Sequence, residues 1–229
     1  MISVCIATYN GAPYIKEQID SILSQLSGDD EVIVSDDGSS DNTLSIIAAM
    51  NDARIKIVEN KKRKGIIGNF ENALYNARGE YIFLSDQDDI WLPDKVKVCV
   101  QQLQTADMIV HDATIVDSKG DILNDSFFAH HHSRNGYWNN LLRNSFLGCC
   151  IAFKKEFLTY ILPIPPIAMH DIWIGLIISR KGKVVFVNMP LIAYRRHENN
   201  ASTTAEKSNL SLLYRIKYRL ELLYYSLSR

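Results

Sequence analysis

Residues 79–96 read GEYIFLSDQDDIWLPDKV and contain, in close succession, the signals for a strand, an acidic turn and a helix. Glu80–Ser85 is mostly apolar and aromatic and leads into polar residues, which predicts a strand. Asp86-Gln87-Asp88-Asp89 follows directly, and Pro93 then opens a helix predicted over Asp94–Gln104. A strand that leads through a polar turn into a helix is the repeating unit of a parallel α/β sheet.

The residues before this stretch repeat the same alternation. Because βαβ units form mostly parallel sheets with right-handed crossovers, the fold class predicted is α/β, with a mostly parallel mixed sheet flanked by helices. Ligands of such folds bind beyond the carboxyl ends of the strands. The predicted strands are Ile2–Ala7, Glu31–Ser35 and Arg54–Glu59, and the predicted helices are Tyr14–Leu26, Thr43–Met50 and Ile67–Ala77.

The second half of the chain has a less regular pattern. A helical pattern returns from Lys207 onward, so we expect one domain over residues 1–206 and a C-terminal helix over residues 207–229. Between them the sequence predicts strands over Asp107–Val116, Gly148–Phe153, Val184–Asn188 and Leu191–Arg195, and helices over Trp138–Arg143 and His170–Ser179.

Composition excludes several classes of protein. The chain has 229 residues, is 47% hydrophobic and carries a net charge of -1, so it can bury one sizeable core and lacks the basic excess of a nucleic-acid-binding protein. Its four cysteines show no metal-binding spacing, which predicts buried thiols in a reduced compartment. Neither a signal peptide nor an apolar run of about 20 residues is evident. We therefore expect a cytoplasmic protein.

Polar clusters follow three of the predicted strands. They are Thr8-Tyr9-Asn10 after the first strand, Asp36-Asp37 after the second and Asp86-Gln87-Asp88-Asp89 after the fourth. Carboxylates that converge on one edge of a sheet repel each other, which favours a bound divalent cation. An acidic turn ahead of a helix is also common without a metal, so this cluster alone leaves metal binding open.

Taken in this order, the three clusters resemble the inverting GT-A glycosyltransferases of family 2. The matching segments are VCIATYNGAPYI, VIVSDDGSSDNT and GEYIFLSDQDDIWLPDKV, and the resemblance extends from Met1 to about Asn200. SDQDDIWLPDK is similar to the bacterial rhamnosyl- and galactosyltransferase branch that builds surface polysaccharides. The resemblance implies metal-dependent transfer of a sugar from a nucleotide diphosphate to a saccharide or lipid-linked acceptor.

The resemblance also implies a nucleotide site. Asp37 would contact the base, and Thr8 and Asn10 would line the same pocket. A carboxylate at the base suggests uracil or thymine, because either offers an imide N–H donor. A UDP-sugar and dTDP-rhamnose both remain open as donors.

The acidic turn would hold the metal and the diphosphate of the donor. By resemblance, Asp88 touches Mg²⁺ or Mn²⁺, Asp86 contacts the ribose or a metal-bound water, and Asp89 contacts the donor sugar or the metal shell. The segment with Arg195 and His197 resembles the family's YRxH sequence. His197 would thus be a further metal ligand or a contact to the diphosphate, or else a surface histidine, and Arg195 would pair with phosphate oxygens.

Inverting transfer also needs a base that activates the acceptor hydroxyl. Met169-His170-Asp171-Ile172-Trp173 matches the family's position for this base, so Asp171 is the predicted base; otherwise it is a helix N-cap. Trp173 is assigned to the acceptor region or to the core. Gly148 matches a small residue at the acceptor entrance, and close packing would equally explain it.

Other functions agree less well with the sequence. A nucleotidyltransferase would need a glycine-rich basic loop after the first strand, and a dinucleotide oxidoreductase would need GxGxxG there, but this chain has Thr8-Tyr9-Asn10-Gly11. A phosphohydrolase with Asp86 as nucleophile remains compatible with the spacing. So does a degenerate, non-catalytic subunit that binds a nucleotide sugar as a scaffold.

The C-terminal helix carries apolar residues at helical spacing, with basic residues between them. Such a helix could pack on its own domain, pack on a second copy in a homodimer, or lie on the inner leaflet of the membrane. The apolar positions are Leu213, Ile216, Leu220 and Leu223, and the basic ones are Arg215, Lys217 and Arg219.

Overall fold

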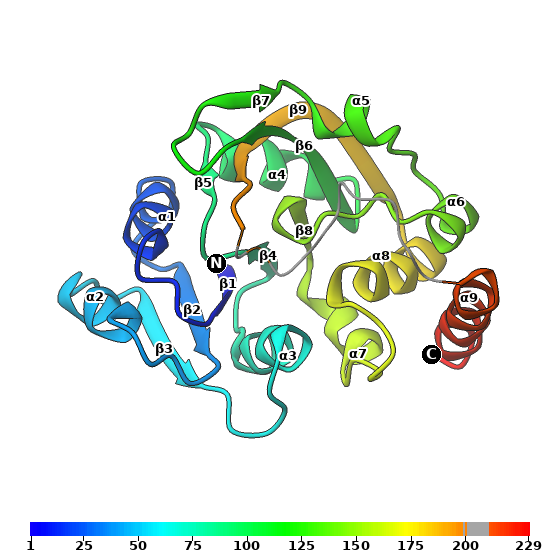
Figure 1. The fold of residues 1–229 in the computed structure, drawn as a ribbon, viewed down its shortest axis with the longest axis horizontal. Coiled ribbons are helices and arrows are strands. Elements are labelled where there is room, and N and C mark those ends of the chain that lie inside the picture. The colour runs from blue at the N-terminus through cyan, green and yellow to red at the C-terminus, as the bar shows by residue number, and fades with distance from the viewer. Residues whose placement is uncertain (199, 201–210) are drawn as a thin grey trace.

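The first half of the chain forms the parallel part of a mixed sheet, as predicted. The structure is a computed structural model and describes residues 1–198, 200 and 211–229. Four strands run parallel in the order β3-β2-β1-β4 (Figure 1). They are β1 (Ile2–Thr8), β2 (Glu31–Asp36), β3 (Ile55–Glu59) and β4 (Tyr81–Ser85), and they alternate with α1 (Ile15–Leu23), α2 (Thr43–Ala49) and α3 (Ile66–Asn76).

The second half extends this sheet with antiparallel pairs. The full order is β3-β2-β1-β4-β8-β6-β9-β5, with β7 paired to β6. The two closing strands predicted after residue 183 are one strand, β9, whose pairing with β6 is parallel and shifts register twice. The strands of this half are β5 (Ile90–Trp91), β6 (Met108–Val116), β7 (Ile122–Asn124), β8 (Ile151–Lys154) and β9 (Val184–Arg195).

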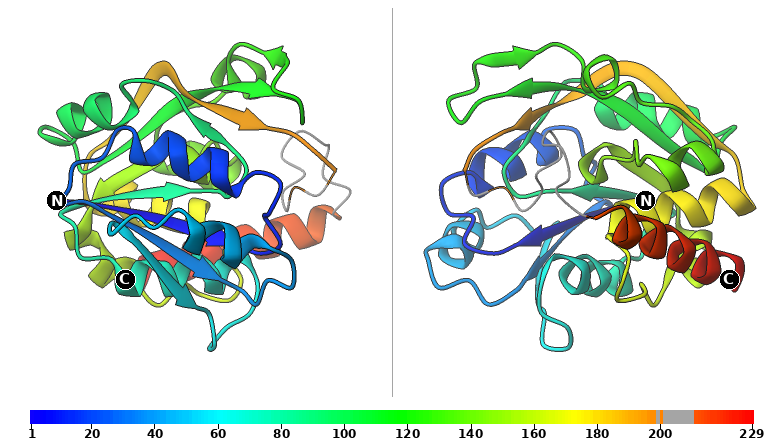
Figure 2. Two further views of the ribbon diagram at one scale, coloured as in Figure 1. Left: turned by 90° about the vertical axis from the view of Figure 1, so that its left-hand side faces the viewer. Right: turned by 45° about the vertical axis from the view of Figure 1, so that its right-hand side comes forward.

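Helices cover both faces of the sheet (Figure 2). The strand predicted from Gly148 begins only at Ile151, because Gly148–Cys150 forms a 3-10 turn. A second 3-10 turn, Lys155–Phe157, leads into α7. The helices of this half are α4 (Lys95–Leu103), α5 (Phe127–His131), α6 (Tyr137–Leu142), α7 (Leu158–Ile161), α8 (His170–Lys181) and α9 (Leu212–Leu227).

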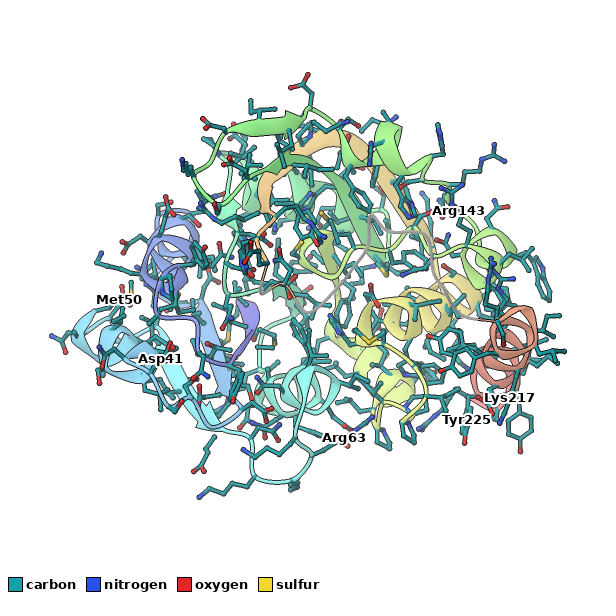
Figure 3. All side chains as sticks on the ribbon, in the orientation of Figure 1. Asp41, Met50, Arg63, Arg143, Lys217 and Tyr225 are labelled. Carbon is teal, nitrogen blue, oxygen red and sulfur yellow. The ribbon has the colours of Figure 1, made fainter. Side chains whose placement is uncertain are left out.

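The C-terminal helix α9 packs at the edge of the molecule, against α6 and α8. Its described part begins at Ser211, so the predicted start at Lys207 lies outside the described residues. Leu222 and Ser226 are buried against the domain, whereas Leu213, Ile216 and Leu220 of the predicted apolar stripe are exposed. Figure 3 places Lys217 and Tyr225 of α9 at the outer margin of the molecule. Within the described residues, none of the helices is long and apolar enough to span a bilayer.

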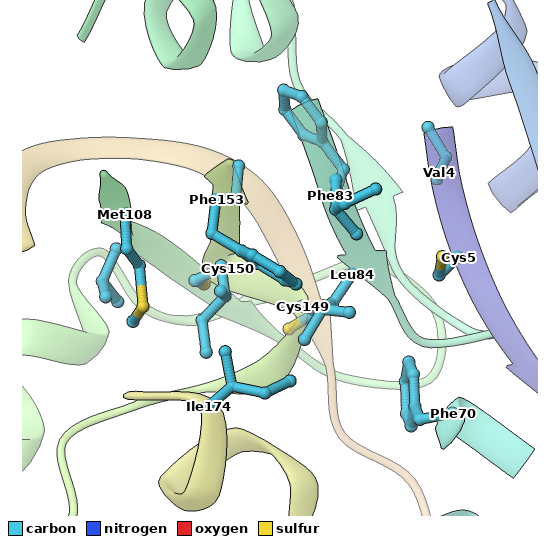
Figure 4. Packing of buried hydrophobic residues seen from close by; sticks show 14 of the residues in the cluster. Val4, Cys5, Phe70, Phe83, Leu84, Met108, Cys149, Cys150, Phe153 and Ile174 are labelled. Atoms are coloured by element: carbon cyan, nitrogen blue, oxygen red, sulfur yellow. The ribbon is translucent and has the colours of Figure 1, made fainter. Parts of the chain in front are cut away.

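The core lies on both faces of the central strands. β2 is buried at every position and β4 at four of its five, as expected for strands covered by helices on two sides. Cys149 and Cys150 pack among Phe153, Leu84 and Ile174 (Figure 4). All four cysteines lie in the described part of the chain and are free and buried, which confirms the prediction of buried thiols.

Candidate functional site

The three predicted polar clusters meet at one edge of the sheet. Thr8 at the end of β1 pairs with Asp36 at the end of β2, and Ile6 of β1 pairs with Ser85 at the end of β4. A pocket of about 390 Å³ opens at this edge. Its lining includes residues of all three clusters together with residues from α3 and from the end of β9, namely Thr8, Tyr9, Asp37, Gly65, Asn69, Asp86, Gln87, Asp88, Tyr194 and Asn200.

The two aspartates after β2 have different tasks. Asp36 is buried, and its Oδ2 accepts hydrogen bonds from the backbone N–H groups of Gly38 (2.9 Å) and Ser39 (2.8 Å), so it shapes the turn. Asp37 faces the pocket. Its Oδ2 accepts from the Gly65 N–H at 2.7 Å and its Oδ1 from the Asn60 amide at 2.8 Å. These bonds fix the Asp37 carboxylate at the pocket wall.

Gln87 connects the acidic turn to the loop after β1. Its Oε1 accepts from the Thr8 hydroxyl at 2.8 Å and from the Tyr9 N–H at 2.9 Å. Thr8 therefore lies at the pocket, and its predicted contact with a nucleotide stays a prediction. Asn10 is not among the residues that line it, because its Oδ1 accepts from the Ser40 N–H at 2.8 Å and joins the loops after β1 and β2. Its predicted contact with the nucleotide stays a prediction.

Asp88 and His197 lie together, although they are far apart in sequence. His197 Nε2 and Asp88 Oδ2 are 2.9 Å apart, and the Asn200 amide donates to the same oxygen at 3.2 Å. Asp88 is buried, and burial raises the pKa of its carboxyl, while the neighbouring His197 opposes this shift. The two residues predicted to hold a metal thus share one small volume.

The other two carboxylates of the turn are close neighbours. Burial and the charges of Asp88 and Asp171 together raise the pKa of Asp86 to about 7, although part of the Asp86 side chain reaches the pocket. Burial, with the charges of Asp88 and Asp86, also holds the pKa of Asp89 well above its usual range. Asp89 Oδ1 accepts from the Arg195 N–H at 2.9 Å, whereas its buried Oδ2 has no protein partner.

These observations agree with a site for a hard divalent cation. Ligand atoms of Asp86, Asp89 and Cys149 lie within 4.8 Å of one another. The unpartnered oxygen of Asp89 and the carboxyl pKa values, raised by burial and by mutual repulsion, indicate that a bound cation would stabilise the ionised carboxylates. Mg²⁺ and Mn²⁺ prefer oxygen ligands, and Mn²⁺ also accepts imidazole, so Asp86, Asp88, Asp89 and His197 are suitable donors.

Lys95 is a member of the site that the sequence analysis missed. Its ammonium group is buried, donates to the Cys149 carbonyl at 2.8 Å and lies 4.1 Å from the centre of the Trp91 ring. Its positive charge lowers the pKa of Asp86 and so compensates part of the negative charge of the acidic turn. A lysine in the first turn of a helix is usually exposed. The available signal was its spacing of four and eight residues from the buried Cys99 and Leu103.

Arg195 supports the acidic turn from the protein side. It is 4% exposed. Its Nε donates to the Asp88 carbonyl at 2.9 Å, and its terminal nitrogens donate to the Ser118 carbonyl at 3.1 Å and the Glu17 carboxylate at 2.8 Å. These acceptors occupy much of the guanidinium group. The predicted pairing of Arg195 with phosphate oxygens therefore stays a prediction.

Asp171, the predicted base, lies in the first turn of α8 and is not among the residues that line the pocket. It is close enough to Asp86 for its charge to raise the pKa of that carboxyl. Its own carboxylate accepts from the Ile172 N–H at 2.7 Å and from the Asn144 amide at 3.4 Å. The surrounding protein raises the pKa of Asp171 to about 6, although part of the side chain reaches solvent. Such a carboxyl can exchange a proton near neutral pH.

Gly148 and Trp173 are placed by packing. A Cβ atom at Gly148 would lie 2.7 Å from Nε2 of His170, so the absence of a side chain there makes room for the buried imidazole. Trp173 is fully buried, and its indole N–H donates to the Ile161 carbonyl at 2.8 Å. The structure therefore places Trp173 in the core and not at a surface that an acceptor could contact.

Comparison with known proteins agrees with this geometry. The family profile described as "Glycosyl transferase family 2" matches residues 3–161, which is more than half of the chain. The glucosyltransferase WfgD of Escherichia coli, named for UDP-Glc and α-D-GlcNAc-diphosphoundecaprenol, is 27% identical over 90% of this chain and 81% of its own length. The chain belongs to glycosyl transferase family 2 and has its GT-A fold.

Two solved structures share this fold at lower sequence identity. Residues 1–349 of TarS from S. aureus, in complex with UDP-GlcNAc, superimpose with a TM-score of 0.71 at 17% identity, covering 99% of this chain and 72% of that one. Glucosyl-3-phosphoglycerate synthase from Mycobacterium tuberculosis, in complex with Mn²⁺, UDP and glucosyl-3-phosphoglycerate, gives a TM-score of 0.62 at 21% identity and covers 100% of this chain and 79% of that one.

Proposed function

We propose that the chain transfers a sugar from a pyrimidine nucleoside diphosphate to the hydroxyl group of a saccharide or lipid-linked acceptor, with inversion at the anomeric carbon. The observation that carries this proposal is the convergence of Asp37 and the acidic turn on one pocket, with Asp171 close enough to Asp86 for its charge to act on it. A carboxylate for the base, a cluster for a cation and a proton acceptor are the three parts that such a transfer needs.

The donor would lie in the pocket with its base against Asp37. The Asp37 carboxylate retains lone pairs beside the bonds from Gly65 and Asn60, and the imide N–H of uracil or thymine is a suitable donor to it. A UDP-sugar and dTDP-rhamnose are both compatible with this contact. Lys64, whose ammonium donates to the Asp37 carbonyl at 2.9 Å, would help to fix this wall.

The diphosphate would lie over Asp86, Asp88 and His197, with Asp89 behind them. A bound Mg²⁺ or Mn²⁺ would supply positive charge to the leaving diphosphate. The Mn²⁺ and UDP complex of the M. tuberculosis synthase supports this assignment. The residues themselves orient the site, since Arg195 donates to the Asp88 carbonyl of the acidic turn, and the charge of Lys95 lowers the pKa of Asp86.

Asp171 would act as the general base. It takes the proton of the acceptor hydroxyl, and the oxygen attacks the anomeric carbon while the nucleoside diphosphate leaves from the opposite face. The configuration therefore inverts. A pKa of about 6 leaves Asp171 mostly charged at neutral pH and still basic enough to accept a proton in the transition state.

The acceptor would belong to surface polysaccharide synthesis at the cytoplasmic face of the inner membrane. The diphosphoundecaprenol in the name of WfgD supports a lipid-linked acceptor. The alternative is a degenerate subunit that binds a nucleotide sugar without turnover. It is less well supported, because every predicted catalytic position holds a competent residue.

Thermal unfolding with UDP, dTDP, GDP and ADP, with and without Mn²⁺, tests the proposal. Ligand at a hundredfold excess over Kd adds about 2.7 kcal/mol to the free energy of unfolding. We expect stabilisation by one pyrimidine nucleotide that requires Mn²⁺ and is lost in Asp88→Asn but kept in Asp29→Asn, an exposed control. The absence of a shift with every nucleotide would contradict the transferase site.

A further inference from the structure

Helix α9 has two opposite faces with different surroundings. Leu222 and Ser226 are buried against the domain, and the Ser226 hydroxyl lies 2.6 Å from the Tyr137 hydroxyl of α6. At 100° per residue, a set of five apolar residues lies on the side away from Leu222. This set, the outer stripe, consists of Leu213, Ile216, Leu220, Tyr224 and Leu227.

The outer stripe is open to solvent. Leu213 is 81% exposed, Leu220 60% and Tyr224 71%. Helix α6 lies beside α9 and adds Trp138, which is 65% exposed, and Leu142, which is 59% exposed. Single exposed apolar residues are ordinary, but a helix-length row of them with a neighbouring tryptophan marks an interaction surface.

The positive charge beside the outer stripe comes from Lys217, which lies next to Tyr224, and from Arg143 after α6; at 100° per residue Arg215 and Arg229 lie on the Leu222 side of the helix. Residues 211–229 contain four basic side chains and one acidic side chain, although the whole chain has a net charge of -1. Arg143, directly after α6, is exposed at the same edge of the molecule (Figure 3). An apolar face with tyrosine and tryptophan, edged by arginine and lysine, is the composition of helices that lie in the interface of an anionic bilayer.

We propose that the outer stripe of α9, with Trp138 and Leu142, docks this protein on an anionic phospholipid surface. The positive charge of the helix complements lipid phosphates, and the apolar side chains would enter the boundary between headgroups and acyl chains. Because a helix of 16 residues is about 24 Å long, it would lie along the surface.

The same helix also reaches the predicted base. Tyr218, on the inner side of α9, is hydrogen-bonded to the backbone of Met169, and burial together with the charge of Asp171 raises its pKa to about 12. Docking through α9 would therefore hold the end of α8 that carries Asp171 close to the lipid surface. The docking surface itself does not depend on the proposed transfer reaction, because it can be measured without donor or acceptor.

Vesicle co-sedimentation of the full chain tests the proposal. We expect binding to vesicles of mixed phosphatidylglycerol and phosphatidylcholine and little binding to phosphatidylcholine alone. Leu220→Ser/Tyr224→Ser should lower the partition coefficient at least about tenfold, because it removes buried apolar area. Arg143→Gln/Lys217→Gln should lower it about fivefold for each charge.

A matched control removes exposed apolar area elsewhere. Ile122 and Leu123 of β7 are 64% and 60% exposed, so Ile122→Ser/Leu123→Ser should bind vesicles like the unmodified protein. All substituted side chains are solvent-exposed, and unchanged unfolding temperatures would show that the variants fold. Equal losses in the stripe and β7 variants, or unchanged binding of the stripe variant, would overturn the proposal. So would absent vesicle binding with a dimer that the stripe substitutions dissociate, which would assign the face to a second copy.

Discussion

Two neighbouring carboxyls illustrate how surroundings assign tasks to identical side chains. Burial is the main cause that raises the pKa of Asp86, and the negative charges of Asp88 and Asp171 raise it as well, whereas the charge of Lys95 opposes them. Burial is the main cause that raises the pKa of Asp171, and the hydrogen bond that its carboxylate accepts from the Ile172 N–H opposes this shift. Added positive charge would restore the ionised form of Asp86. Asp171, with a pKa of about 6, is mostly ionised at neutral pH without added positive charge.

Substituting the predicted base should separate catalysis from binding. Asp171→Asn keeps the size of the side chain and loses the basic oxygen, so we expect kcat to fall by roughly 10²–10⁴ while nucleotide binding is retained. Steady-state kinetics with thermal-shift titration measures both quantities. Asp20→Asn, on the exposed side of α1, is the control. An active Asp171→Asn variant would assign the base elsewhere.

The activity should depend on pH through the same group. Asp171 has a raised pKa of about 6, and only its charged form accepts a proton. Below that value kcat should therefore fall about tenfold per pH unit, and above it a plateau should follow. A pH profile of kcat at saturating donor measures this, and a rate that is constant down to pH values near 4 would rule out this assignment.

The acidic turn should lower the stability of the metal-free protein. Asp86 has a folded-state pKa of about 7 against an ordinary value of 3.8, so its stabilising contribution is present at low pH and is lost as the pH rises through about 7. Asp86→Asn should therefore raise the unfolding temperature near pH 8 by roughly 2–8 °C, for about 1–2 kcal/mol, and much less at pH 4. The control Asp29→Asn should change the unfolding temperature neither near pH 8 nor at pH 4.

At the scale of elements, local pattern predicted the first half of the chain well. The strands β1, β2 and β4 are buried at nearly every position, so their apolar residues contrast with the polar turns that follow them, whereas β3 at the edge of the sheet is partly exposed. The strand β5 has two residues and no periodicity, and it exists because β9 pairs with it. Contacts between distant segments likewise determine the turn at Gly148 and the inward lysine of α4.

The packing of two elements against each other depends on Gly148. An alanine there would bring its Cβ within 2.7 Å of the His170 ring, so Gly148→Ala should destabilise by roughly 1–3 kcal/mol. His170→Ala removes the obstacle, and the double variant should be at least about 1 kcal/mol more stable than the sum of the single effects. Denaturant unfolding measures the cycle, and additive effects would refute the contact. Gly28→Ala, with no neighbour within 4 Å, is the neutral control.

At the scale of the whole molecule, the site is assembled from both ends of the chain. The loop after β1, the acidic turn, α8 and the end of β9 all contribute, and Asp88 meets His197 although 109 residues separate them in the sequence. Sequence reasoning could name most of these residues from their positions after strands. It could not predict which face of α9 packs inward, because its apolar residues surround much of the helix and only the domain surface selects Leu222.

The distribution of tryptophan gives the molecule a built-in optical reporter. Trp91 and Trp173 are buried, whereas Trp138 is exposed beside α9. Fluorescence emission that moves to shorter wavelength when anionic vesicles are added should therefore come from Trp138 alone and disappear in Trp138→Phe. A shift that persisted in that variant would instead report a change around the buried indoles. The emission wavelength of the native tryptophans can thus distinguish docking on lipid from rearrangement of the core, without any attached dye.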